Sequence, residues 1–203
     1  VKWIDSNKIE ITYNLTSETQ TYNEDKDVIL ILDTSGSMFG DKLQTVKDNS
    51  IELLDTLLEV ETNKIALIEF NTTSNIIQEF TNDKETLINK INSLDANGST
   101  NYNQALHNLD IILDTYNKES NRDLVVMFLT DGYPVEENPS QNATYQILKS
   151  KYDYLEINGI QYEMGETLKQ EVKDITDRQY VANTKNLSNV LLEVLVASKK
   201  YDE

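Results

Sequence analysis

The sequence predicts an α/β fold in which a doubly wound, mostly parallel central sheet is flanked by helices. Residues 27–32 and 124–132 are almost continuously apolar, as is typical of central strands that are buried on both faces. Apolar residues at helical spacing separate such segments, beginning with an expected helix over residues 41–60. Strands that alternate with amphipathic helices indicate this sheet, whose ligands bind beyond the carboxyl ends of its strands.

The other elements follow from local patterns. Residues 8–15 (KIEITYNL) alternate apolar and polar side chains, which predicts an edge strand or a strand with one solvated face. The strand expected at 64–70 (KIALIEF) pairs with 74–80 as a hairpin, so one edge strand is antiparallel. Further helices are expected at 83–91, 101–116, 138–151, 166–175 and 187–198, and further extended segments at 154–164 and 179–182.

Composition indicates one domain. We expect it to cover residues 27–203, after a lead-in strand within residues 1–26 that packs on it. The 203 residues are enough to bury a core without disulfides, and the absence of Cys excludes thiolate metal ligands and a cysteine nucleophile. The chain begins at Val1 and opens on no signal-peptide pattern, as expected for a segment excised from a longer protein.

Net charge and hydropathy exclude some partners. The formal net charge of −17 disfavours nucleic acid and anionic membrane surfaces as partners. No apolar stretch is long enough to span a bilayer, so we expect no membrane insertion by this segment.

Oxygen-bearing side chains follow the two most apolar strands. Asp33, Ser35 and Ser37 alternate directly after the first strand, and Asp131 ends the second. Between them in the chain, the polar turn NGSTN carries Thr100 immediately before a helix. Two carboxylates and three hydroxyls, with no imidazole or thiolate, favour a hard cation such as Mg²⁺. Two carboxylates balance a divalent ion, which would stay electrophilic and accept an outside carboxylate as a further ligand.

Each part of this set has a simpler interpretation when it is taken alone. Asp33 could be a helix cap or a turn residue, and Thr100 could cap the helix that follows it. The dipeptide of Asp131 and Gly132 is common in turns. The three parts together, at the ends of predicted strands, favour one shared site.

These motifs resemble a von Willebrand factor type A domain that carries a metal-ion-dependent adhesion site. The matching parts are DTSGS (residues 33–37), the threonine of NGSTN and the aspartate of TDGYP, and the resemblance extends from residue 27 to about residue 198. It implies a Rossmann-like sheet with one antiparallel edge strand. It also implies Mg²⁺ bound directly or through water, with Mn²⁺ and Ca²⁺ as alternatives. The implied metal ligands are Asp33, Ser35, Ser37, Thr100 and Asp131, and a partner protein supplies a further Glu or Asp. The middle turn departs from the pattern at Asn97, where Gly is commoner, and this bears on loop shape.

The setting implied by the resemblance is a Gram-positive bacterial surface or cell wall. The TDGYP turn, the richness in Asn, Lys and Ile, and the lead-in strand are similar to those of cell-wall and pilus adhesins. The expected partner is a host matrix protein or another surface subunit. Two alternatives stay open: an intracellular accessory domain that partners an AAA+ ATPase, and a structural spacer in a surface protein.

Enzyme motifs are incomplete, so no catalytic activity is expected. Ser35 stands where a haloacid-dehalogenase-like phosphotransferase needs a second Asp, and residues 36–42 lack the Walker spacing. The one histidine, His107, falls within a predicted helix. Instead, apolar and aromatic side chains beside the site predict a contact ring for a protein partner, with local packing as the alternative. The ring members are Met38, Phe39, Tyr102 and Tyr133.

Overall fold

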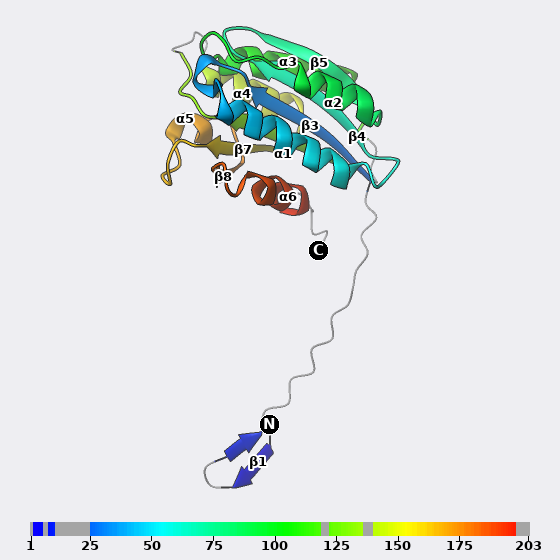
Figure 1. Cartoon of the computed structure of the whole chain (residues 1–203), viewed down its shortest axis with the longest axis vertical. Coiled ribbons are helices and arrows are strands. Elements are labelled where there is room, and N and C mark those ends of the chain that lie inside the picture. Colours follow the sequence, from blue (N-terminus) through cyan, green and yellow to red (C-terminus); the bar gives the residue numbers. More distant parts are fainter. Residues whose placement is uncertain (1, 6–7, 11–24, 119–121, 136–139, 198–203) are drawn as a thin grey trace.

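The computed structural model describes residues 2–5, 8–10, 25–118, 122–135 and 140–197. In this part of the chain, six strands form one twisted sheet with helices on both faces (Figure 1). From edge to edge the strands are β5 (Ser74–Thr81), β4 (Lys64–Phe70), β3 (Asp25–Asp33), β6 (Arg122–Thr130), β7 (Ile157–Tyr162) and β8 (Arg178–Ala182). All neighbours are parallel except β4 and β5, which confirms the predicted doubly wound sheet with one antiparallel edge strand.

The helices lie close to their predicted positions except α5, which covers only four of the ten residues predicted at 166–175. The predicted fourth helix begins outside the described residues, and its described part starts at Gln141. The helical segments are η1 (Gly36–Met38, a single 3-10 turn), α1 (Asp41–Leu57), α2 (Lys84–Asn92), α3 (Tyr102–Thr115), α4 (Gln141–Lys151), α5 (Gln170–Lys173) and α6 (Leu187–Ala197). None of them, within the described ranges, is long and apolar enough to cross a membrane.

The N-terminal segment differs from its prediction. Strands β1 (Lys2–Asp5) and β2 (Lys8–Glu10) pair antiparallel in a two-stranded sheet of their own, so β2 adds no edge to the main sheet. The strand predicted over residues 8–15 ends at Glu10 where it is described, and residues 11–15 lie outside the described part. Strand β3 begins at Asp25, two residues before the expected domain boundary. Packing of the lead-in on the domain stays a prediction.

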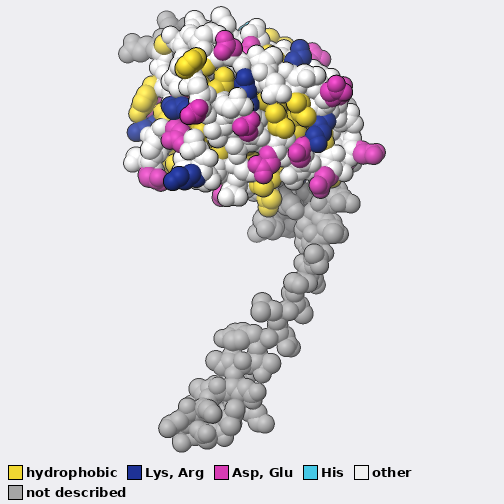
Figure 2. All heavy atoms as spheres, in the orientation of Figure 1, with side chains coloured by type: hydrophobic (Ala, Val, Ile, Leu, Met, Phe, Trp, Pro, Cys, Tyr) yellow, Lys and Arg dark blue, Asp and Glu magenta, His cyan; other side chains and the backbone are white. Residues whose placement is uncertain are grey.

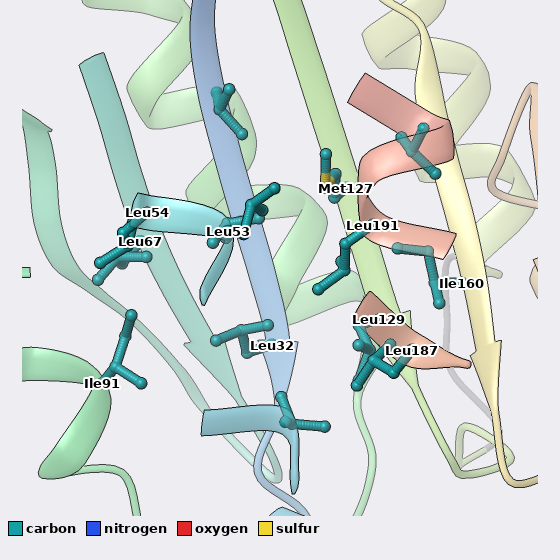
Figure 3. Packing of buried hydrophobic residues seen from close by; sticks show 14 of the residues in the cluster. Leu32, Leu53, Leu54, Leu67, Ile91, Met127, Leu129, Ile160, Leu187 and Leu191 are labelled. Carbon is teal, nitrogen blue, oxygen red and sulfur yellow. The ribbon is translucent and has the colours of Figure 1, made fainter. Parts of the chain in front are cut away.

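Alternate side chains of the central strands supply two separate cores. On one face Leu32 and Leu67 pack with α1, α2 and α6, as the close view in Figure 3 shows. On the other face Ile31 and Phe128 pack with α3 and α4. Because successive strand residues point to opposite faces, one continuous apolar run can fill both cores. This double burial explains why β3 and β6 are so apolar.

Acidic side chains are scattered over the face shown in Figure 2, with lysines and arginines between them. The main buried charged group away from the candidate site lies at the amino ends of β3 and β6. There Arg122 donates to both carboxylate oxygens of Asp27, at 2.9 and 2.5 Å, and Tyr116 donates to Asp27 Oδ2 at 2.8 Å. This arrangement joins the two central strands at the end of the sheet that carries no candidate site.

Candidate metal centre

The candidate site begins where β3 ends, at Asp33. Leu32 pairs with Leu129 in the parallel register of β3 and β6, so Asp33 lies opposite Thr130. Its carboxylate is fully buried and accepts from the Ser35 backbone N–H at 2.8 Å and from the Thr130 hydroxyl at 2.6 Å. Burial raises the pKa of Asp33 to about 6, and the hydrogen bonds from Ser35 and Thr130 partly offset that rise.

Both serines of the motif continue from Asp33 toward Asp131. Ser35 Oγ lies 3.0 Å from Ser37 Oγ, and Ser37 Oγ donates to Asp131 Oδ1 at 2.6 Å. The bond from the Ser35 backbone to Asp33 is an Asx turn, so the turn interpretation of Asp33 is also correct. That turn directs both hydroxyls toward the second carboxylate, 94 residues later in the chain.

Backbone hydrogen bonds hold the NGSTN turn against the loop that carries the two serines. Gly36 N–H donates to Gly98 O at 2.9 Å, and Asn97 N–H donates to Thr34 O at 2.9 Å. The side chain that caps α3 belongs to Asn101, which accepts from the Gln104 N–H. Thr100 is therefore not the cap of this helix, which removes the simpler interpretation of that residue.

Together the three loops surround an open pocket of about 440 Å³. Gly132 closes one wall, because a Cβ there would lie 2.8 Å from Thr100 Oγ1 and 3.4 Å from Ser37 Oγ. A Cβ at this position would displace the Thr100 hydroxyl, whereas the distance to Ser37 Oγ is an ordinary contact. The pocket is lined by Ser35, Ser37, Gly98, Ser99, Thr100, Asp131, Gly132, Tyr133 and Val135. Four of the five predicted ligands thus share one pocket, and Asp33 joins them through its bonded neighbours.

Two polar residues of the site were missed at the level of sequence. Thr130 donates to Asp33, as described above, and its own oxygen accepts from the Gly132 N–H at 3.2 Å. Lys42, in the first turn of α1, forms an ion pair of 2.5 Å with Asp131 Oδ2. Thr130 directly precedes Asp131 in the TDG motif, but only the strand register shows that it faces Asp33. Lys42 follows the serine motif closely, but no sequence pattern indicates where its side chain ends.

The predicted contact ring is only half exposed. Met38 and Tyr102 have no exposed surface, so as accessible contact residues they were predicted wrongly. Met38 packs in the core on the α1 side, and Tyr102 packs edge-on against Phe128 while its hydroxyl donates to Gly132 O at 2.7 Å. By contrast, Phe39 is 78% and Tyr133 is 57% exposed.

The donor set is compatible with a hard divalent cation. The described residues hold no group of three or more His, Cys, Asp or Glu side chains placed to bind a metal. A metal in this pocket would therefore depend on two carboxylates together with hydroxyl groups. All of these are oxygen donors, as Mg²⁺, Mn²⁺ and Ca²⁺ prefer, and the open side of the pocket leaves room for water or another ligand.

Two comparisons with known sequences give matches to this chain. Residues 28–134, more than half of the chain, match the family model described as von Willebrand factor type A domain. The chain is also 29% identical over 140 residues to inter alpha-trypsin inhibitor, heavy chain 4, of Mus musculus, an alignment that covers 63% of this chain. It spans only 15% of that relative.

Solved structures with the same fold include bacterial pilus proteins. The vWF domain of the type V pili tip protein Mfa5 from Porphyromonas gingivalis superposes with a TM-score of 0.71 at 15% identity, over 88% of this chain and 98% of that one. PilB minor pilin from Streptococcus sanguinis gives a TM-score of 0.66 at 15% identity, over 86% and 61%. The von Willebrand factor type A protein from Catenulispora acidiphila gives 0.69 at 21%, over 86% and 42%.

Proposed function

Because the chain belongs to the von Willebrand factor type A family, we propose that it is a divalent-metal-dependent protein-binding module. In this proposal Ser35, Ser37, Thr100 and Asp131 hold Mg²⁺ in the pocket, directly or through water, and Asp33 supports them from below. Mn²⁺ or Ca²⁺ could take the same place. The bound ion would supply an electrophilic centre that accepts a Glu or Asp carboxylate of a partner protein.

The observation that carries this proposal is the chain of contacts from Asp33 through Ser35 and Ser37 to Asp131. It joins two buried carboxylates through the Ser35 backbone N–H and the hydroxyls of Ser35 and Ser37, and these two serines line an open pocket. A merely structural turn would have no need of two buried acids. Exposed Phe39 and Tyr133 beside the pocket supply the apolar contacts that protein partners favour.

The same residues favour binding over catalysis. His107, the one histidine of the chain, lies exposed on α3 and does not line the pocket. We therefore propose a role without catalysis. The likeness in fold to pilus proteins supports, by analogy, a place in an extracellular bacterial surface protein.

Metal binding is tested by titrating the protein with Mn²⁺ and following the free-ion signal by electron paramagnetic resonance. Wild type should bind one equivalent, and a variant combining Ser35→Ala with Ser37→Ala should bind at least about tenfold more weakly. Ser99→Ala is the matched control, because Ser99 lines the same pocket but is outside the predicted ligand set. Equal Mn²⁺ affinity in wild type, the double variant and Ser99→Ala would refute the proposal.

Carboxylate capture is tested on the metal-loaded protein with acetate as the probe. Paramagnetic broadening of the acetate resonances by bound Mn²⁺ should saturate with acetate concentration in wild type and disappear in excess chelator. A protein that binds Mn²⁺ but broadens acetate no more than a chelated ion does would favour the structural-spacer alternative. Thermal unfolding with and without metal then reports how far the ion stabilises the fold.

A further inference from the structure

Among the described residues, Lys42 is the one positively charged side chain for which the structure records a contact with the candidate metal ligands. It lies in the first turn of α1, and its Nζ is 2.5 Å from Asp131 Oδ2. The Asp131 side chain is fully buried, whereas the Lys42 side chain is 36% exposed. A buried carboxylate normally needs a partner, and here it has an ammonium on one oxygen and a serine hydroxyl on the other.

The two oxygens of Asp131 have different surroundings. Oδ1 accepts from Ser37, which lines the pocket, whereas Oδ2 is held by Lys42, which does not. The ammonium therefore reaches Asp131 from α1 and binds the oxygen that Ser37 does not contact. Lys42 thus contacts one of the candidate ligands without lining the pocket itself.

This ion pair changes the charge of the site. Asp33 and Asp131 together would neutralise a divalent ion, and little attraction for a further anion would be left. With Lys42 included, the three side chains sum to one negative charge, so the loaded site carries one net positive charge. A carboxylate partner would benefit from that charge, because the chain as a whole has a formal net charge of −17 and repels anions.

We propose that Lys42 is a specificity-determining residue that offsets the charge of Asp131, weakens metal binding, and strengthens capture of an anionic carboxylate by the bound ion. This inference rests on the proposed metal-dependent function. It assigns the preference for an acidic partner to one side chain outside the metal-binding motif.

The test measures two affinities that should move in opposite directions when Lys42 is replaced. In Lys42→Met, Mn²⁺ should bind about tenfold more tightly by the free-ion signal, because an unpaired buried carboxylate then faces the ion. Acetate should bind the Mn²⁺-loaded variant severalfold more weakly than it binds loaded wild type. Lys42→Arg keeps the positive charge and should stay close to wild type in both measurements.

Lys47→Met is the matched control. Lys47 is on the same helix and donates to the Asn92 carbonyl at 3.0 Å, so its loss removes the same charge without touching the site. This variant should leave both affinities near wild type. Circular dichroism of each metal-free variant checks that the fold is retained. If Lys42→Met does not fold, the test depends on Lys42→Arg. Mn²⁺ and acetate affinities of Lys42→Arg far from those of wild type would then overturn the proposal.

The outcomes separate this inference from the function on which it rests. Failure of wild type to bind Mn²⁺ or acetate would refute the proposed function itself. If wild type binds both, weaker Mn²⁺ binding in Lys42→Met would show that Lys42 only positions Asp131, and would overturn the inference. Equal shifts in Lys42→Met and Lys47→Met would also overturn it, since overall charge would then explain the effect.

Discussion

Replacing Asp33 by Asn should stabilise the metal-free protein at neutral pH. Burial raises the pKa of Asp33 from its ordinary 3.8 to about 6 in the folded state. The folded protein therefore holds this proton more tightly than the unfolded chain does, and ionisation of Asp33 opposes folding. The free energy of unfolding should lose this contribution as pH rises from about 4 through 6, when no metal is present to offset the charge.

The size of the effect follows from the two pKa values. The interval between 3.8 and about 6 corresponds to about 3 kcal/mol once the pH is well above 6, and to almost nothing below pH 4. Asn is nearly the same shape and can keep both contacts of the carboxylate. Its carbonyl can accept from the Ser35 N–H, and its amide can donate to the Thr130 oxygen. The full gain of about 3 kcal/mol is therefore an upper bound for Asp33→Asn.

The assay is chemical unfolding of wild type and Asp33→Asn in EDTA at several pH values between 4 and 7.5. The variant should be more stable by 1 to about 3 kcal/mol at pH 7.5, and the two proteins should converge toward pH 4. The matched control is Asp48→Asn, because Asp48 is exposed on α1 and accepts a side-chain hydrogen bond from Gln44. Its difference from wild type should not depend on pH in this way.

Two results would refute this reasoning. One is an Asp33→Asn variant that is less stable than wild type in EDTA at pH 7.5. The other is a stability difference that stays constant between pH 4 and 7.5, because no shifted ionisation would then be involved. Repeating the series in excess Mg²⁺ should reverse the order at pH 7.5 if the ion binds, since Asn removes a charge that the ion needs.

Two further substitutions probe opposite ends of the sheet. Gly132→Ala places a Cβ 2.8 Å from Thr100 Oγ1, so Mn²⁺ affinity should fall at least about tenfold while the circular dichroism spectrum stays native. An unchanged Mn²⁺ affinity would contradict the close approach of Gly132 and Thr100. Arg122→Met leaves buried Asp27 without its cation and should lower the free energy of unfolding by about 3 kcal/mol or more, as measured by urea denaturation. Lys84→Met, at an exposed ion pair, should change it little, and equal losses in the two variants would argue against a special role for burial.

Most of the architecture could be predicted from local patterns. The predicted strand 64–70 coincides with β4, and the helix predicted from residue 41 begins at Asp41. These elements carry strong apolar periodicity, so the prediction depended on residues within one segment. Helix ends were less accurate, since α1 stops at Leu57 rather than near residue 60. The last residues of a helix depend on the tertiary contacts around them.

The rim of the site shows where local patterns fail. Met38, Phe39, Tyr102 and Tyr133 all follow or precede a motif residue closely, and the sequence treats them alike. In the structure, Met38 and Tyr102 face the two cores, and only Phe39 and Tyr133 face solvent. The direction of a side chain in a short loop depends on the backbone path, which no spacing rule supplies.

That two apolar strands end in oxygen-bearing side chains can be read from the sequence, because burial on both faces demands uninterrupted apolar runs and makes their ends conspicuous. Which of these groups meet depends on the folded arrangement of the strands and helices. The register of β3 and β6 places Thr130 on Asp33, and the first turn of α1 brings Lys42 to Asp131. These contacts join residues 97 and 89 positions apart. Pairings at such distances depend on the packing of whole elements, and packing is a property of the folded chain.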